Sequence, residues 1–257
     1  MGTHVVERMA VEIDGRGDAV VMIHGLGGTS NTFTPQMEVA GRMRAIRPDL
    51  PGSGRSRANG AISIQSFVDR VAAAARALGV ERAHFVGHSM GTIVCCHLAA
   101  QHPSLVRSLA LFGPLLAPSD TARKGLHDRA RKAREEGMAP IADAIVQSAT
   151  SADTKSSQPV TVALVREFLM RQDAEGYAQT CEALAAAEPA DLGRVRCRAL
   201  LITGDEDAIA PPSGARAMAE RMDTAQTIIL NRCGHWTGLE RAREVNDALR
   251  SFYFGRA

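Results

Sequence analysis

The sequence predicts an α/β protein whose mostly parallel sheet carries helices on both faces. Short apolar and β-branched runs alternate with longer segments of helical periodicity through the first 115 residues, and such runs return after residue 197. These runs lack the apolar–polar alternation of a half-exposed strand. Continuous apolar runs are typical of parallel strands that are buried on both faces of a sheet.

The predicted strands of the first half end at turn-forming residues. Those strands are residues 5–13, 19–23, 43–47, 83–86 and 105–112. Glycine-rich stretches at residues 24–28 and 49–54 follow the second and third of them. Apolar residues at three- and four-residue intervals predict one helix over residues 64–78 and another over residues 91–102. The order strand, helix, strand is that of a parallel sheet with crossover helices.

The second half opens with a long interval that has no convincing strand. From about residue 117 to 195 the sequence is charged and helical, with helical stretches at 123–136, 141–146, 160–170 and 177–187. The chain is completed by a strand at 198–203, a helix at 212–222, a strand at 226–230 and a helix at 239–252. One core of residues 1–116 and 196–257, interrupted by a helical insertion of residues 117–195, fits this order better than two consecutive domains.

Composition and charge exclude several classes of protein. The 30 Lys and Arg residues are balanced by 28 Asp and Glu residues, so the chain offers no electrostatic surface for DNA or RNA. No apolar run is long enough to cross a membrane, and the N-terminus has no signal-peptide pattern. Five cysteines without metal-ligand spacing favour reduced thiols in a cytoplasmic protein that holds no metal. A homo-oligomer is compatible with this sequence.

The segment Gly87-His-Ser-Met-Gly91 lies directly after a predicted strand and before a predicted helix. In that context Gly-x-Ser-x-Gly predicts a sharp turn that holds Ser89 above the edge of the sheet, with glycines where side chains would clash. A serine hydroxyl is a weak nucleophile at neutral pH and needs an imidazole to accept its proton. The alternative reading is an ordinary turn in which Ser89 caps the helix.

Two later motifs favour the nucleophilic reading of Ser89. Asp207 ends the segment Gly-Asp-Glu-Asp after one predicted strand, and His235 follows the next one. A carboxylate orients such an imidazole and stabilises its charged form. Because the carboxyl ends of parallel strands meet at one edge of a sheet, we expect Ser89, Asp207 and His235 to lie together there. Asp205 occupies the same loop as Asp207, and we expect it to stabilise the turn.

Acyl transfer also needs backbone N–H groups that bind the oxyanion of the tetrahedral intermediate. Met90, the residue after Ser89, supplies one such N–H group at the start of a helix. Leu26, in the glycine-rich loop at residues 24–28, is the best candidate for the second. That loop has neither the lysine of a P-loop nor the glycine spacing of a dinucleotide site.

These segments together resemble the α/β-hydrolase superfamily over essentially the whole chain. The matching segments are residues 24–28, 49–56, 87–91, 204–207 and 234–235. The resemblance implies an α/β-hydrolase fold with a helical cap, or lid, inserted after strand 6 of that fold, and no cofactor. It also supports Asp207 as the acid and Leu26 as an oxyanion donor. We expect Tyr177 and Trp236 near the substrate pocket, and we place Gly25 and His88 there as well.

Within the superfamily the chain looks most like 3-oxoadipate enol-lactonases and their esterase relatives. The similar segments are residues 81–85, 175–178 with Cys181, and 211–214. The Cys-Gly-His-Trp segment at residues 233–236 looks more like hydrolases that cleave carbon–carbon bonds in aromatic ring-fission products. The sequence therefore predicts a serine hydrolase of a small ester or lactone. The alternatives are carbon–carbon bond hydrolysis and a ligand-binding protein without catalysis on this fold.

Overall fold

The computed structural model describes residues 2–58 and 60–255. At its centre is an eight-stranded sheet in the order β1-β2-β4-β3-β5-β6-β7-β8. The strands are β1 (Gly2–Val6), β2 (Met9–Asp14), β3 (Ala19–Ile23), β4 (Arg44–Pro48), β5 (Ala83–His88), β6 (Val106–Phe112), β7 (Arg198–Gly204) and β8 (Ala225–Leu230). Strands β3 to β8 are parallel to one another. At one edge of the sheet β2 pairs antiparallel with β4, and β1 pairs antiparallel with β2. The predicted mostly parallel sheet is confirmed.

The N-terminal part corrects one prediction. Residues 5–13 do not form a single strand, because the chain reverses at Glu7 and Arg8 and pairs β1 with β2. Both turn residues have positive φ angles, 50° and 63°. Two such residues make the hairpin turn that suits the twist of paired strands. Glu-Arg lacks the Asn-Gly or Asp-Gly signature of that turn, so the sequence carried no signal for it.

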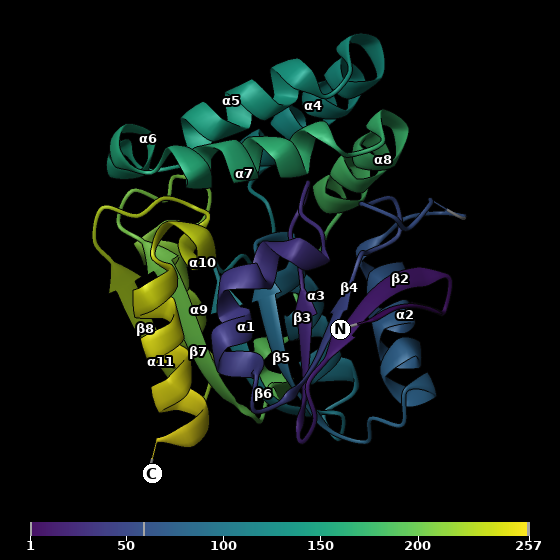
Figure 1. Ribbon diagram of the computed structural model, residues 1–257, viewed down its shortest axis with the longest axis vertical. Coiled ribbons are helices and arrows are strands. Elements are labelled where there is room, and N and C mark those ends of the chain that lie inside the picture. Colours follow the sequence, from purple (N-terminus) through teal and green to yellow (C-terminus); the bar gives the residue numbers. More distant parts are fainter. Residues whose placement is uncertain (1, 59, 256–257) are drawn as a thin grey trace.

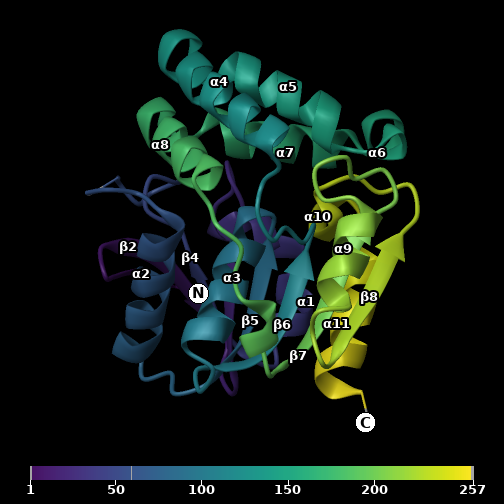
Figure 2. The ribbon, with the colours of Figure 1, turned by 180° about the vertical axis from the view of Figure 1, so that it is seen from behind.

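Helices cover both faces of the sheet, and successive strand residues alternate between the two faces. One face carries α2 (Ile64–Ala77), α3 (Met90–Gln101) and α9 (Pro212–Ala219); the other carries α1 (Met37–Ala40) and α11 (Ala242–Phe254) (Figures 1 and 2). In β3, Val21 and Ile23 pack in the first of these layers, whereas Val20 and Met22 pack in the second. Since both faces bury apolar residues, the strands read as continuous apolar runs.

Five consecutive helices lie above the carboxyl ends of the parallel strands (Figure 1). They are α4 (Asp120–Glu136), α5 (Ala139–Ala149), α6 (Ala152–Ser157), α7 (Pro159–Met170) and α8 (Ala174–Ala185), called here the α4–α8 layer. The layer occupies the interval between β6 and β7, where the sequence predicts helices only. The short helix α6 was not predicted, because its polar sequence carries no apolar periodicity.

The C-terminal helix also differs from its prediction. Residues 239–252 belong to two helices, α10 (Thr237–Glu240) and α11, which are separated at Arg241 by non-helical backbone angles of −131° and 50°. Two 3₁₀ helices, η1 (Ser30–Gln36) and η2 (Leu192–Arg194), complete the fold and were not predicted. Across residues 2–58 and 60–255, none of the helices is both long and apolar enough to span a membrane.

The buried carboxylate of Asp49 ties the turn after β4 to the loop after β3. It accepts hydrogen bonds from the N–H groups of Ser30 (2.7 Å) and Arg55 (3.0 Å) and from Arg55 Nε (2.8 Å). Burial by itself raises the pKa of Asp49, but the Arg55 guanidinium and these N–H donors outweigh it, and the net pKa is lowered. Asp49 therefore stays ionised in the folded protein, and its charge stabilises both loops.

We expect Asp49→Asn to lower the free energy of unfolding at pH 7 by about 1–3 kcal/mol. The NH₂ group of the asparagine amide would face the N–H donors of Ser30 and Arg55, which need an acceptor. The pKa of Asp49 is lowered on folding from 3.8, so its contribution is present above that pH and is lost as the pH falls below it. Urea unfolding of the wild type and the variant should therefore differ at pH 7 and converge as the pH falls through the lowered pKa of Asp49. A difference that stays constant with pH would contradict this assignment.

Candidate active site

Ser89 lies on a strained turn between β5 and α3. Its backbone has φ 55° and ψ −120°, in a region that residues with a side chain rarely adopt. The flanking glycines make this turn fit: a Cβ on Gly87 would come within 2.6 Å of the Gly91 carbonyl oxygen. A Cβ on Gly91 would come within 2.1 Å of the Ile23 carbonyl oxygen. Backbone crowding thus explains the Gly-x-Ser-x-Gly spacing.

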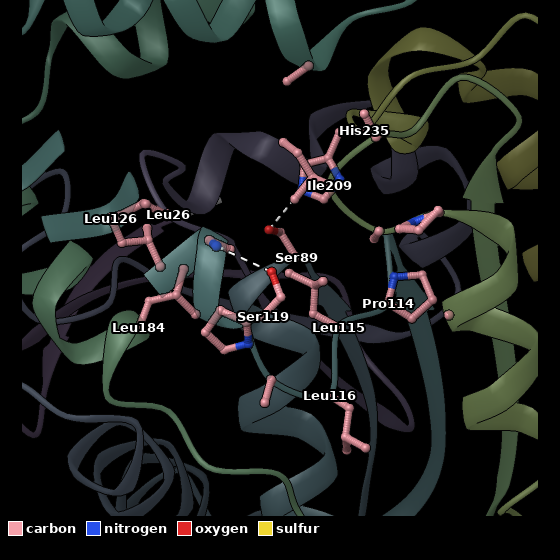
Figure 3. A pocket seen from close by; sticks show the side chains of 18 of the residues that line it. Leu26, Ser89, Pro114, Leu115, Leu116, Ser119, Leu126, Leu184, Ile209 and His235 are labelled. Atoms are coloured by element: carbon pink, nitrogen blue, oxygen red, sulfur yellow. Dashed lines mark hydrogen bonds between the residues drawn. The ribbon is translucent and has the colours of Figure 1, made fainter. Parts of the chain in front are cut away.

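Three side chains from separate loops form one hydrogen-bonded network. His235 Nε2 lies 2.8 Å from Ser89 Oγ, and His235 Nδ1 lies 2.8 Å from Asp207 Oδ2. The three loops follow β5, β7 and β8, and Figure 3 shows the contact between Ser89 and His235. Ser89 is 7%, Asp207 3% and His235 4% exposed. We refer to these side chains below as the Ser89–His235–Asp207 network.

Asp207 is held as a charged acceptor. Its second oxygen, Oδ1, accepts hydrogen bonds from the N–H groups of Ile209 (2.9 Å) and Ala210 (2.8 Å). Burial alone raises the pKa of Asp207, but His235 and these two N–H groups outweigh burial and lower the pKa overall. The carboxylate is therefore ionised at neutral pH, where it accepts a hydrogen bond from His235 Nδ1.

Asp205 connects two loops and does not contact His235 through a described hydrogen bond. Its carboxylate accepts the N–H group of Cys233 at 3.0 Å, which links the loop after β7 to the loop after β8. Asp205 has no described hydrogen bond to His235, whose Nδ1 is taken by Asp207. The structure thus gives Asp205 the turn-stabilising position that we expected from the sequence.

Leu26 and Met90 flank Ser89 from two directions. Met90 is the first residue of α3, where backbone N–H groups have no partner inside the helix. Leu26 lies in the loop after β3 and lines the cavity beside Ser89 (Figure 3). Buried His24 shapes that loop: its Nδ1 contacts the Gly25 carbonyl oxygen (2.8 Å) and its Nε2 accepts the Leu50 N–H group (2.9 Å).

Gly25 is not a pocket residue, contrary to the prediction. It lies behind Ser89, where an added Cβ would come within 2.8 Å of Ser89 Cβ and 2.9 Å of the His88 carbonyl oxygen. Gly25 does not line the cavity above Ser89. The small residue is needed because the loop after β3 passes directly against the Ser89 turn.

His88 supports His235 from the side. Its Nε2 donates a hydrogen bond to the His235 carbonyl oxygen at 3.0 Å, and its ring packs 4.8 Å from the ring of Trp236. Burial lowers the pKa of His88 to about 3, so the ring is neutral at physiological pH. His88, Trp236 and Tyr177 all line the cavity beside Ser89.

A cavity of about 700 Å³ opens above Ser89, between the sheet edge and the α4–α8 layer. Its wall is mostly aliphatic (Figure 3). The aliphatic side chains include Leu26, Leu115, Leu116, Leu126, Ile145, Leu169, Leu184 and Ile209. Most of these residues were not predicted from the sequence, because the sequence does not show whether an apolar residue of a helix or loop faces the core or a cavity.

Glu240 is a buried carboxylate that sequence reasoning missed. It is 3% exposed and accepts four hydrogen bonds, from the N–H groups of Ser151, Gly234 and Trp236 and from the Thr154 hydroxyl. All four distances lie between 2.8 and 3.0 Å. Glu240 therefore fastens both neighbours of His235 to the α4–α8 layer.

Comparisons with known proteins confirm the predicted α/β-hydrolase fold. A family model described as the alpha/beta hydrolase fold matches residues 18–242. The chain is 29% identical over 246 residues to a pyrrolizixenacetamide deacetylase of Xenorhabdus hominickii, covering 93% of this chain and 92% of the relative. It is 27% identical over 252 residues to a 2-hydroxymuconate semialdehyde hydrolase of Pseudomonas putida, covering 93% and 88%.

Among solved structures, the chain is similar to the enol-lactonase from Burkholderia xenovorans LB400. The TM-score is 0.91 at 29% sequence identity, and the match covers 98% of this chain and 99% of the enol-lactonase. The similarity to enol-lactonases that was predicted from the sequence is therefore confirmed.

We expect Glu240→Gln to lower the free energy of unfolding by about 1–3 kcal/mol, because the amide presents its own N–H donors to groups that all donate. Glu244→Gln, an exposed change on α11, is the matched control and should be neutral within about 0.5 kcal/mol. Urea unfolding at pH 7 measures both. Equal stability of the two variants would mean that Glu240 does not hold the His235 loop to the α4–α8 layer.

Proposed function

The chain belongs to the α/β-hydrolase family, and we propose that it is a serine hydrolase of carboxylic esters or small lactones, enol-lactones included. The observation that carries the proposal is the Ser89–His235–Asp207 network at the floor of a mostly apolar cavity. A nucleophile, a base and an orienting acid stand there in hydrogen-bond contact. The similarity to an enol-lactonase supports the choice of ester and lactone substrates.

The proposed reaction uses groups that the site already holds. Ser89 Oγ attacks the substrate carbonyl while His235 Nε2 accepts its proton, and Asp207 stabilises the resulting imidazolium. The N–H groups of Leu26 and Met90 bind the oxyanion. His235 then returns the proton to the leaving alcohol or enol, which leaves an acyl group on Ser89. Water, activated by His235, hydrolyses that acyl-enzyme and restores the serine.

We further propose that the α4–α8 layer acts as the cap that encloses a small-molecule substrate. Residues from α4, α5, α7 and α8 form much of the cavity wall, so the layer separates the reaction from bulk water. The cap then corresponds to residues 117–195 and the core to residues 1–116 and 196–257. We place the enzyme in the cytoplasm, where its five free cysteines would stay reduced.

Carbon–carbon bond hydrolysis is the second candidate. The similarity to a 2-hydroxymuconate semialdehyde hydrolase supports it, together with Trp236 beside His235 in the cavity wall. The same network can serve both reactions, since each begins at a carbonyl group. Turnover of a ring-fission diketone without turnover of esters or enol-lactones would favour this candidate over the first.

Hydrolysis of p-nitrophenyl acetate and butyrate tests the proposed function. We expect the wild-type protein to release p-nitrophenol and Ser89→Ala to lose this activity by about a thousandfold or more, because the nucleophile is removed. Circular dichroism of Ser89→Ala should match the wild type. Equal release by both proteins would exclude Ser89 as the nucleophile. No release by folded wild-type protein would overturn the proposal that the protein hydrolyses esters.

Asp207→Asn and Asp205→Asn form a matched pair in one loop. We expect Asp207→Asn to reduce kcat for p-nitrophenyl butyrate by about a thousandfold or more, because an amide fails to stabilise the imidazolium of His235. Asp205→Asn keeps the Ser89–His235–Asp207 network and should reduce kcat far less. Steady-state kinetics at pH 7 compare them, and the reverse ranking would show that Asp205 is the acid.

A further inference from the structure

Two arginines, Arg129 and Arg221, and no aspartate or glutamate, are among the residues that line the cavity. Arg221 is exposed beyond the end of α9, where water screens its charge. Arg129 is half-buried on the inner face of α4. It shares that face with Ala122, Gly125 and Leu126, which lie at the spacing of successive helical turns and also line the cavity.

Arg129 differs from the other arginines of the α4–α8 layer. Each of the others is within 4 Å of a carboxylate, as in the pairs Arg123–Glu188, Arg131–Glu135, Arg134–Glu175, Arg166–Asp143 and Arg171–Glu167. Within the part of the chain that the structure describes, Arg129 forms no ion pair. A half-buried guanidinium in an aliphatic cavity loses hydration without a charged partner, so an anion that enters the cavity gains a strong interaction there.

Tyr177, on α8, stands beside Arg129. Its hydroxyl is buried and makes no well-formed hydrogen bond among the described residues. Arg129 and Tyr177 line the same cavity, from α4 and α8. Burial raises the pKa of Tyr177, and the charge of Arg129 partly opposes this rise. The Tyr177 ring in turn packs near Gly27, where an added Cβ would come within 3.3 Å of Tyr177 Cε2. Tyr177 therefore adjoins the loop that carries Leu26.

We propose that Arg129 and the Tyr177 hydroxyl bind an ionised carboxylate of the substrate, so that the ester or lactone carries a second, charged acid group. This inference rests on the proposed function and narrows its substrate class to anionic esters and lactones. A guanidinium presents two parallel N–H donors to a carboxylate, and a tyrosine hydroxyl adds a third donor. The aliphatic wall accommodates the carbon skeleton, while the reactive carbonyl lies over Ser89.

Matched pairs of substrates test the charge requirement. One pair is mono-4-nitrophenyl glutarate and its methyl ester, which place the charge on the acyl part. The other is 4-acetoxybenzoate and its methyl ester, which place it on the leaving group. We expect a higher kcat/KM for the anion than for the neutral ester in at least one pair, because only the anion pairs with Arg129. Equal or lower values for both anions would overturn the inference.

Arg129→Met removes the charge and keeps the length of the side chain. We expect it to raise KM for the preferred anion by about tenfold or more and to change KM for the neutral ester far less, so that the preference for the anion is lost. Arg129→Lys should recover part of the effect. Arg131→Met is the control, since Arg131 is exposed and paired with Glu135 on the same helix. A similar change in Arg131→Met, or none in Arg129→Met, would contradict the role of Arg129.

A binding measurement separates failure of this inference from failure of the proposed function. Trp236 is the single tryptophan of the chain and lines the cavity, so its fluorescence reports binding of glutarate without turnover. Saturable quenching in Ser89→Ala that disappears in Ser89→Ala/Arg129→Met supports the carboxylate site, even if no ester is cleaved. Ester cleavage without anion preference and without glutarate binding would overturn the carboxylate site and leave the proposed function in place.

Discussion

The geometry of the candidate active site depends first on the turn at Ser89, which has a positive φ angle. Close packing around this turn leaves no room for a side chain at Gly87 or Gly91. The turn costs backbone energy, of order 1–3 kcal/mol for such a residue, which the surrounding sheet and helix α3 must offset. In return Ser89 Oγ projects into the cavity while the first N–H group of α3 lies beside it. The loop after β3 packs directly against this turn, so a side chain is excluded at Gly25 as well.

A second set of hydrogen bonds holds His235 in register with Ser89. The loop after β8 has no regular structure of its own, and it is fastened on both sides. Asp205 holds the Cys233 N–H group, and Glu240 holds the N–H groups of Gly234 and Trp236. The His235 N–H group itself donates to the Ala149 carbonyl oxygen at the end of α5. The position of His235 therefore depends on the α4–α8 layer as well as on the sheet.

The negative and positive charges near the cavity lie in different places. The Asp207 carboxylate is ionised behind His235, whereas the buried rings of His24 and His88 have lowered pKa values and stay neutral. The histidines that shape the site thus add no charge that competes with His235. Arg129 adds a positive charge on the opposite wall, where no carboxylate lines the cavity. Under the proposed function, the floor of the cavity carries out proton transfer and the wall that holds Arg129 selects the substrate.

The sequence by itself determined the fold class and the residues of the network. Parallel strands bring their carboxyl ends to one edge, so Ser89, Asp207 and His235 could be placed together from their positions after strands alone. Glycine spacing likewise revealed the turn, because Gly-x-Ser-x-Gly between a strand and a helix is typical of it. Only the tertiary structure decided the hairpin at Glu7 and Arg8, the four bonds of Glu240 and the cavity wall with Arg129. Those features depend on which faces of distant segments meet, and local periodicity does not encode that information.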